Sequence, residues 1–356
     1  MNAVSMDVIG AEDLDQHLLQ AWQDIQLASP ELQHPMASAE FMLSVARHRT
    51  DVRFGVIRSR GKAIGFFPFQ RQLNGIGHPV GFRLNDYQVG IFAPDASIDS
   101  AWMLKSCGLS SWHFDHLVSS QHCFASGHFL LEDSPYIDLS QGLDAYVASI
   151  SDRARWRSNI RNQERMARDV GPVRFEFHSA DGAAFRSLLD WKTAQIQRDG
   201  RRCVFEWPWV IKTLEDLRTT ANPHCSGVLS VLYAGDRLAA VHFGLRSHEI
   251  LHWWITTYNR EFRIYSPGAL LLARVIEEAA RLGIRRIDLG KGAEPYKEKL
   301  QSGATQLATG VVCSAAWRRL FHQTSHALQE SVRSSALAGP AKSVAYWLEA
   351  RVNRRV

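Results

Sequence analysis

Cysteine is scarce in this chain of 356 residues, and its five copies are Cys107, Cys123, Cys203, Cys225 and Cys313. The count is odd, and no two cysteines have the CxxC spacing of a zinc or redox motif. We therefore expect neither a disulfide framework nor a structural metal site, and a reducing compartment is the better expectation.

The chain also lacks the hydrophobic segments that would direct it to or through a membrane. No apolar run approaches the roughly 18 residues of a membrane-spanning helix. The first twenty residues carry four acidic side chains, whereas a secretory signal has a basic start followed by an unbroken apolar stretch. The sequence therefore predicts a cytoplasmic protein.

The remaining composition is that of an ordinary folded protein. Hydrophobic residues make up 46% and charged residues 22%, which supplies a buried core and argues against disorder. The length predicts two domains. The net charge is +5, but the segment from residue 316 to the C-terminus contains seven Lys or Arg and only two Asp or Glu. The basic excess therefore belongs to the tail, and the body of the chain is neutral.

The spacing of apolar residues predicts helices and strands in a similar order in the two halves of the chain. In the first half, helices at 13–27 and 38–49 precede a hairpin whose strands, 52–58 and 63–71, flank a turn at 59–62. The later elements predicted in this half are a helix at 99–107 and strands at 111–117 and 135–139.

The second half repeats this pattern. A long helix at 142–169 ends at Gly171-Pro172, and a second hairpin joins strands 226–233 and 238–245. The other predicted elements are strands at 173–178, 249–257, 285–289 and 306–313 and helices at 182–198, 207–220, 269–282, 294–301, 315–334 and 341–353. The match predicts a tandem duplication in an α/β (α+β) fold; the alternative is that hairpins are simply common. The predicted domains are 1–140, 141–314 and a basic helical tail at 315–356.

The segment between the strand at 249–257 and the next helix has the features of an anion site. It contains Arg263-Ile264-Tyr265-Ser266-Pro267-Gly268-Ala269. The first N–H groups of a helix have no internal partner, and the helix dipole favours negative charge there. The amides of Ser266, Gly268 and Ala269 are the expected donors, with Arg263 adding charge. The plainer alternative is a helix start in which Ser266 caps the helix and Pro267 begins it.

Further motifs complete the pattern of a known family. They are Leu270-Leu271-Leu272 after the loop, Ile287-Asp288-Leu289-Gly290-Lys291-Gly292-Ala293-Glu294-Pro295-Tyr296-Lys297, the arginine-rich stretch 155–161, and the first-half segments 65–69 and 85–87. Over residues 40–313 the chain resembles the FemAB-like branch of the GNAT superfamily, and within it bacterial acetyltransferases associated with cellulose and other exopolysaccharide synthesis. The usual GNAT loop is Arg/Gln-x-x-Gly-x-Gly/Ala, and Ser266 stands at its first glycine.

The resemblance implies two packed GNAT-like domains, with mixed, mostly antiparallel sheets flanked by helices. It also implies transfer of an acyl group, first of all acetyl from acetyl-CoA, to an amino sugar or related envelope precursor, with acyl-CoA as co-substrate and no metal. No Cys or Ser lies beside a clear triad, so we expect direct transfer in a ternary complex.

Two alternatives to this function remain open. One is an aminoacyl-tRNA-dependent transferase, as among the better-studied Fem relatives, but the neutral body offers little of the basic surface that nucleic acid requires. The other is a non-catalytic accessory subunit of a polysaccharide synthase.

Polar residues at 288–297 are the main candidates for chemistry, because open α/β sheets bind ligands beyond the carboxyl ends of their strands. Asp288 or Glu294 is expected to act as a base or to hold the amine. Tyr296 would protonate the leaving thiolate, and Lys297 would contact phosphate or stabilise an oxyanion. The plainer alternatives are caps for the two carboxylates, core packing for Tyr296 and a surface position for Lys297.

Other candidates are less specific. His242 would either face the cleft and shuttle a proton or lie satisfied in the core. Trp253 and Trp254 point to opposite faces of a strand, and one of them, for which we take Trp254, would pack against a sugar or the pantetheine arm. Asp86 and Tyr87 are added as substrate residues because they belong to the family-like first-half motif.

The arginines of the helix at 142–169 recur every four residues, at Arg153, Arg157, Arg161 and Arg165. An anionic acceptor, such as a nucleotide sugar or a lipid pyrophosphate, would relieve their mutual repulsion, which makes Arg157 and Arg161 candidate acceptor ligands. The alternative is a solvated helix face.

The C-terminal tail has apolar residues at helical spacing among basic ones, which predicts either peripheral contact with an anionic membrane or a helix packed on the body. Its apolar residues are Trp317, Leu320, Phe321 and Leu328.

Overall fold

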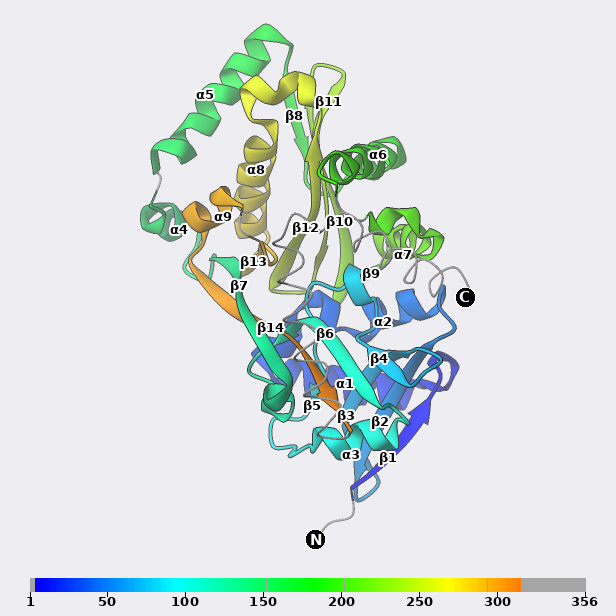
Figure 1. Ribbon diagram of the computed structural model, residues 1–356. Coiled ribbons are helices and arrows are strands. Elements are labelled where there is room, and N and C mark those ends of the chain that lie inside the picture. The colour runs from blue at the N-terminus through cyan, green and yellow to red at the C-terminus, as the bar shows by residue number, and fades with distance from the viewer. Residues whose placement is uncertain (1–3, 152, 201–202, 293, 315–356) are drawn as a thin grey trace, which may run out of the picture. The chain divides into compact units, whose positions relative to one another are not determined.

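The computed structural model describes residues 4–314 except 152, 201–202 and 293 (Figure 1). The predicted tail helices and their membrane contact lie outside these residues. The described chain forms two compact units, unit 1 from residues 4–29, 42–132 and 307–314 and unit 2 from residues 30–41 and 133–306. The sequence-based domain boundaries stay a prediction. Among the described helices, none is both long and apolar enough to cross a membrane.

Unit 1 is a mostly antiparallel sheet with strand order β1-β2-β3-β4-β6-β14, in which only β4 and β6 run parallel. Its strands are β1 (Val4–Ile9), β2 (Val52–Ser59), β3 (Lys62–Arg71), β4 (Ile76–His78), β5 (Ile91–Phe92, paired with β3), β6 (Ser111–Val118) and the end of β14 (Gly303–Cys313). Its helices are α1 (Gln16–Ala28), α3 (Ser100–Ser106) and the end of α2 (Ala39–Ala46), whose first three residues belong to unit 2. Aromatic residues fill its core, where Trp112 lies 4.9 Å from Phe124 and 5.1 Å from Phe67, measured between ring centroids.

Unit 2 has the strand order β7-β13-β12-β11-β10-β8, in which only β12 and β13 run parallel. Its strands are β7 (His128–Asp138), β8 (Val173–Glu176), β9 (Ala221–Asn222, paired with β10), β10 (Cys225–Ala234), β11 (Arg237–Arg246), β12 (Ile250–Tyr258) and β13 (Arg286–Asp288). Its helices are α4 (Leu143–Ser149), α5 (Arg153–Asp169), α6 (Gly182–Arg198), α7 (Pro208–Thr219), α8 (Pro267–Arg281) and α9 (Pro295–Leu300). Helix α8 covers one face of the sheet, with α5 and α4 beside it, and α6 and α7 cover the other face (Figure 1).

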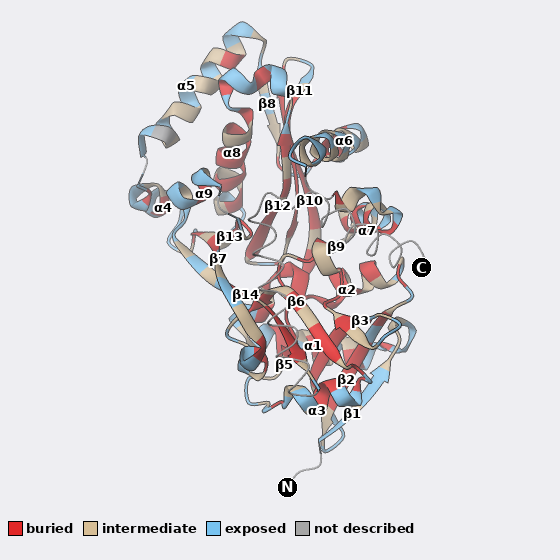
Figure 2. Cartoon of the chain, viewed as in Figure 1, coloured by how far each residue is buried: buried red, intermediate tan, exposed pale blue. Residues whose placement is uncertain are grey.

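Short 3-10 helices connect these elements. They are η1 (Ala11–Asp13), η2 (Pro30–Gln33), η3 (Pro35–Ala37), η4 (Phe82–Leu84), η5 (His122–Gly127), η6 (Val204–Glu206) and η7 (Arg260–Tyr265). Figure 2 shows buried residues along the strands and on the inner side of α8. The apolar face of α8, with Leu271, Val275 and Ile276, packs into the core of unit 2 because its apolar residues recur at helical spacing.

The two units repeat one topology, as the sequence predicts. In unit 1, β2-β3-β4-β6 pair antiparallel, antiparallel and parallel, and β10-β11-β12-β13 do the same in unit 2. The last strand of each sheet comes from the other half of the sequence. The end of β14 pairs with β6, and residues 136–138 of β7 pair with β13.

The prediction of one long helix at 142–169 is wrong in one respect, because this segment forms two helices, α4 and α5. Ile150 is extended, with φ −65° and ψ 140°, and its side chain is buried. Ser149 Oγ donates to the carbonyl of Tyr146 and helps to end α4. Burial of Ile150 therefore overrides the local helix preference.

A close approach of β10 to α7 gives a test of this packing. A Cβ atom at Gly227 would lie 2.3 Å from the Leu217 carbonyl oxygen, which belongs to the backbone and cannot swing aside. We expect Gly227→Ala to lower the free energy of unfolding by about 2 kcal/mol in denaturant titrations, the usual cost of overpacking. Gly182→Ala, whose Cβ would meet the flexible Arg186 side chain at 3.6 Å, is the matched control and should be close to neutral. Equal stability of both variants would contradict the packing.

Candidate active site

A cavity of about 360 Å³ lies in unit 2, lined by residues of α5, α6, β12, α8 and α9 and of the segment before α8. All four residues predicted to hold the donor contribute to its wall: Arg263, Ser266, Gly268 and Ala269. Two of the predicted catalytic residues, Glu294 and Tyr296, line it as well. The structure thus brings the two main motifs of the second half into one cavity.

The cavity forms where two parallel strands separate. Strands β12 and β13 pair from Ile250–Arg286 to His252–Asp288, and β12 then continues to Tyr258. Trp253 and the three residues at 256–258 of this continuation line the cavity. Backbone groups beyond the last pair are therefore close to any ligand that enters between the strands.

The loop before α8 has a strained turn at the position where the GNAT pattern has its first glycine. Ser266 is left-handed, with φ 52° and ψ 52°, and its side chain does not cap the helix. A non-glycine residue in this conformation costs about 1–2 kcal/mol. The plain helix start, with Ser266 as its cap, is therefore wrong, while Pro267 does begin α8 as expected.

The amides of the loop are used differently from the prediction. Ser266 N donates to the carbonyl of Arg263 at 3.1 Å, and Ala269 N donates to the carbonyl of Ser266 at 3.0 Å. The expectation of free amides is therefore wrong for these two residues. No acceptor in the described part of the chain takes a hydrogen bond from Gly268 N. An anion at the cavity wall can therefore use Gly268 N and the Arg263 side chain.

The two tryptophans of β12 have the opposite assignment to the one predicted. Trp253 lines the cavity, whereas Trp254 lies on the other face of the strand, with ring centroids 6.1 Å from Phe243 and 6.5 Å from Phe41. His242 is fully buried and stacks on Trp253, with ring centroids 3.9 Å apart. Burial, and then the neighbouring His252, lowers the pKa of His242. A neutral, fully buried ring is not placed to shuttle protons in the cavity.

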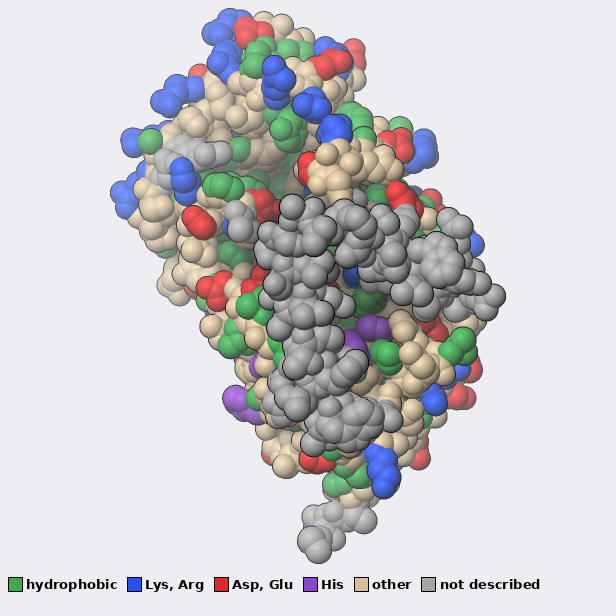
Figure 3. All heavy atoms as spheres, viewed as in Figure 1, with side chains coloured by type: hydrophobic (Ala, Val, Ile, Leu, Met, Phe, Trp, Pro, Cys, Tyr) green, Lys and Arg blue, Asp and Glu red, His purple; other side chains and the backbone are tan. Residues whose placement is uncertain are grey.

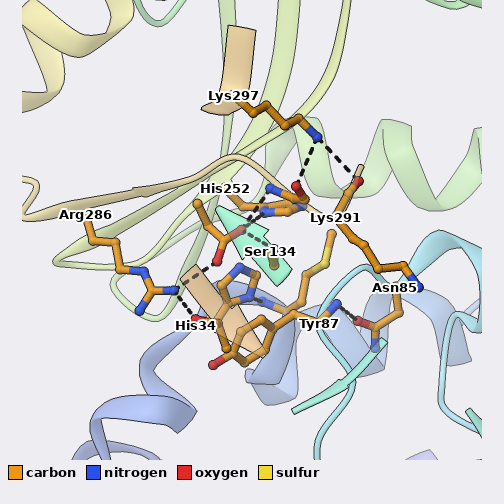
Figure 4. Close-up of polar contacts among 12 residues, drawn as sticks. His34, Asn85, Tyr87, Ser134, His252, Arg286, Lys291 and Lys297 are labelled. Carbon is orange, nitrogen blue, oxygen red and sulfur yellow. Dashed lines mark hydrogen bonds and ion pairs between the residues drawn. The ribbon is translucent and has the colours of Figure 1, made fainter. Parts of the chain in front are cut away.

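Lys297 is buried rather than exposed or directed at phosphate. Its Nζ donates to the carbonyls of Gly290 at 3.0 Å and Lys291 at 3.3 Å (Figure 4). It also forms an ion pair with Glu294 at 2.9 Å. These contacts hold the loop between β13 and α9. Lys297 is therefore placed to position Glu294 and the loop that leads to Tyr296.

Glu294 and Tyr296 differ in their proton affinity. Burial, reinforced by the charge of Glu294, raises the pKa of Tyr296 to about 12, so its phenol keeps its proton at neutral pH. Partial burial acts to raise the pKa of Glu294, but the hydrogen bond and charge of Lys297 outweigh it and the pKa is lowered. Tyr296 is thus protonated at neutral pH, and Glu294 is an anion suited to holding an ammonium.

Asp288, the other predicted base, is buried at the point where the strands separate. Its Oδ1 accepts from Gly290 N at 2.9 Å and from Ser134 Oγ at 3.2 Å, and its Oδ2 accepts from Arg286 Nη2 at 3.2 Å. Burial opposes ionisation, but the hydrogen bond with His252 and the surrounding charges hold the pKa of Asp288 well below its usual range. It is a fixed anion that orders the start of the loop.

Two histidines that sequence reasoning missed complete this cluster (Figure 4). His252 Nδ1 lies 3.7 Å from Asp288 Oδ1, and the rings of His252 and His34 lie 5.0 Å apart. His34 precedes η3, and its Nδ1 accepts from Met36 N at 3.2 Å. No pattern marked His34, since its neighbours carry no periodic signal. His252 is marked only by its place beside the two tryptophans.

The spacing of these groups meets the distance condition for a metal ion, but their chemistry fits one poorly. One ligand atom each from His34, His252 and Asp288 lies within 4.8 Å of the others. Because His34 Nδ1 accepts a backbone N–H, its Nε2 carries the proton and cannot bind a cation. The positive Arg286 already contacts the carboxylate. These residues therefore suit a hydrogen-bonded cluster, and no step is assigned to a metal.

The remaining predicted substrate residues are not among the residues that line the cavity. Arg157 and Arg161 are exposed on α5 and are not among the lining residues, whereas Trp156 and Asn159 of the same helix are. Asp86 and Tyr87 belong to unit 1, where Tyr87 is buried and Asn85 Oδ1 accepts from its amide.

Removing the charge of Asp288 should destabilise the protein in a pH-dependent way. Asp288→Asn leaves Arg286 beside a neutral group, and we expect a loss of roughly 3 kcal/mol near pH 7 in denaturant titrations. The folded-state pKa is lower than the unfolded value of about 3.9. The stabilisation is therefore present above that value and lost as the pH falls below it. The difference in free energy of unfolding between wild type and Asp288→Asn should therefore shrink below about pH 4. Ser134→Ala, which removes one uncharged donor, is the control, and a gap unchanged in acid would contradict this role.

Comparison with known proteins agrees with this geometry. The sequence pattern of the acetyltransferase (GNAT) domain family matches residues 154–298. No curated protein matches the chain in sequence. Similar solved structures include a tandem GNAT protein from the clavulanic acid biosynthesis pathway (TM-score 0.53, 11% identity, 88% of this chain and 99% of that one) and FemX (TM-score 0.55, 9% identity, 89% and 99%).

Another similar structure is the C-terminal domain of a putative lysylphosphatidylglycerol synthetase from Agrobacterium fabrum (TM-score 0.52, 11% identity, 90% and 97%). Identities this low show the fold alone. They show that the chain has a tandem GNAT-like fold. The domain match over residues 154–298 shows that it carries a GNAT acetyltransferase domain and is an acyltransferase.

Proposed function

We propose that the protein is an N-acyltransferase that moves an acyl group, acetyl as first choice, from acyl-CoA to an amino sugar or related envelope or exopolysaccharide precursor. The observation that carries the proposal is the meeting of the donor loop with Glu294 and Tyr296 in one cavity. The acceptor class is supported by the resemblance of residues 287–297 to the exopolysaccharide-associated branch.

The residues of the cavity fit a CoA thioester. Gly268 N and Arg263 offer a hydrogen-bond donor and a positive charge where α8 begins, which suits a pyrophosphate. Beyond them the wall is apolar, with Leu272 and Ile276 of α8 and Trp253 of β12, which suits the pantetheine arm. A Cβ at Gly268 would meet only the ring of Tyr258, at 3.5 Å.

The reaction needs two proton transfers: the acceptor amine loses a proton, and the leaving sulfur gains one. Acyl-CoA would supply a thioester whose carbon–sulfur bond breaks as the acceptor nitrogen bonds to the acyl carbon. Glu294 holds the acceptor amine and accepts its proton, while Lys297 keeps the carboxylate in place. Tyr296 donates its phenolic proton to the departing sulfur. Trp253 and the apolar wall of α8 exclude water from the thioester.

Blocking the donor loop tests the donor site. We expect acetyl-CoA at about 100 times its Kd to stabilise the wild type by about 2.7 kcal/mol in thermal-shift assays. Gly268→Trp should lose this stabilisation because the indole fills the cavity beside Tyr258, whereas Gly268→Ala should keep most of it. Leu282→Trp, at an exposed position at the end of α8, controls for added bulk. CoA stabilisation retained in Gly268→Trp would exclude this loop.

Removing the phenol tests the chemical step. Tyr296→Phe should lower kcat for thiol release, measured with acetyl-CoA and a panel of amino sugars, by about 100-fold, while CoA binding is kept. Tyr233→Phe on β10 removes a phenol bonded to Asp181 and should leave kcat unchanged.

The panel also tests the alternatives. If none of the amines is acylated and CoA esters do not shift the melting temperature, the proposed function is overturned. Aminoacyl transfer from tRNA with steep salt dependence would favour the Fem-type reaction instead.

A further inference from the structure

We infer that Arg165 of α5 is a positioning residue for the acyl donor: together with Asp169 it clamps η7 and holds Ser266 in its left-handed conformation. The inference rests on the proposed function, because the loop it positions is the proposed donor loop. The sequence predicts that the arginines spaced four residues apart on α5 bind the acceptor, whereas this inference assigns Arg165 to the donor loop.

The side chain of Ser266 does not explain its strained conformation. Ser266 lies between η7 and α8, and its side chain makes no capping hydrogen bond. Without the freedom of glycine, this backbone persists only when its surroundings impose it. The elements packed against η7 are surroundings that can impose it.

Two residues of α5, one helical turn apart, hold the end of η7. Arg165 Nη2 donates to the carbonyl of Ile264, and its guanidinium carbon lies 5.0 Å from the centroid of the Tyr265 ring. Asp169 Oδ2 accepts from the Tyr265 hydroxyl at 3.2 Å. Helix α5 thus holds both residues immediately before Ser266. It contacts Ile264 through its carbonyl, and Tyr265 through the face of its ring and its hydroxyl.

Helix α5 is in turn tied to the helix that the loop begins. Arg274 of α8 donates from Nε and Nη2 to Gln163 Oε1 at 3.1 and 2.6 Å, and Met166 is fully buried in the core of unit 2. The contacts form a closed path from α5 through η7 and Ser266 to α8 and back. Trp156 and Asn159 of α5 line the same cavity. Donor binding and the position of α5 are therefore linked.

Arg165 differs from the other arginines of its row. Arg153, Arg157 and Arg161 are exposed, while Arg165 is half-buried against η7. In Figure 3, Lys and Arg side chains (blue) gather along the outer edge of the region of α5. That outer face of α5 is solvated. Arg165, at its edge, is the arginine that contacts the loop.

A double-mutant cycle between Arg165 and Ser266 tests the clamp. Arg165→Ala should raise KM, and the Kd from thermal shift, for acetyl-CoA about tenfold, which corresponds to 1.4 kcal/mol, with kcat changed less than about twofold. Ser266→Gly makes the left-handed turn available without strain. In that background, Arg165→Ala should therefore raise KM less than about threefold. Equal factors in both backgrounds, or a loss of kcat with KM unchanged, would overturn the positioning role.

A second measurement needs no ligand and separates this inference from the proposed function. Hydrogen exchange of residues 260–269, followed by mass spectrometry, should be faster in Arg165→Ala than in wild type and less so in the double variant. Arg281→Ala, which removes an exposed ion pair with Glu278 at the other end of α8, is the control. Unchanged exchange in Arg165→Ala sinks the clamp.

Failure of wild type to bind acetyl-CoA, with the exchange results as expected, leaves the clamp standing and refutes the donor. If Arg165→Ala does not fold, Tyr265→Phe removes only the bond to Asp169. It should then raise KM by a smaller factor with kcat kept, and an unchanged KM would count against the clamp.

Discussion

One buried negative charge sits where β12 and β13 separate. Transfer of a carboxylate from water to a protein interior costs several kcal/mol unless donors and positive charges surround it. Asp288 meets this condition with Gly290 N, Ser134 Oγ and Arg286. The hydrogen bond to Gly290 N turns the chain out of the strand at the place where the cavity opens. The direction of the following loop depends on this anion.

A buried cation completes the arrangement at the other end of that loop. Lys297 satisfies its charge with two carbonyls and with Glu294, so the same contacts that make its burial tolerable also orient a cavity residue. Neither Asp288 nor Lys297 lines the cavity. Two charged residues that resemble catalytic groups in the sequence therefore serve to hold the segment that carries Glu294 and Tyr296.

Local patterns explain how far the sequence predicts this protein. Both hairpins, the helix start at Pro267 and the motif at 287–297 follow from turn residues and periodicity, and these features are local in the chain. Alternation along β12 places Trp253 and Trp254 on opposite faces, but it does not say which face borders the cavity. That choice depends on where α8 packs, which is a tertiary property.

The features that escaped prediction depend on contacts distant in sequence. His34 belongs to a twelve-residue segment, 30–41, that joins unit 2 although the residues on either side belong to unit 1. The burial of Lys297 depends on three oxygens that the loop presents only once it has folded. The left-handed Ser266 stands where the family has glycine, and its conformation follows from α5, about one hundred residues earlier in the chain.

The exchange of end strands between the two halves has a consequence for biosynthesis. β6 finds one neighbour, β4, early in synthesis, but its other neighbour begins at Leu307, 189 residues after Val118. At synthesis rates of about 5–20 residues per second, this interval is on the order of 10–40 s. During that time the nascent chain presents an open sheet edge beside an aromatic core, the kind of surface that pairs with other chains. Productive folding therefore depends on shielding this edge until β14 has been synthesised.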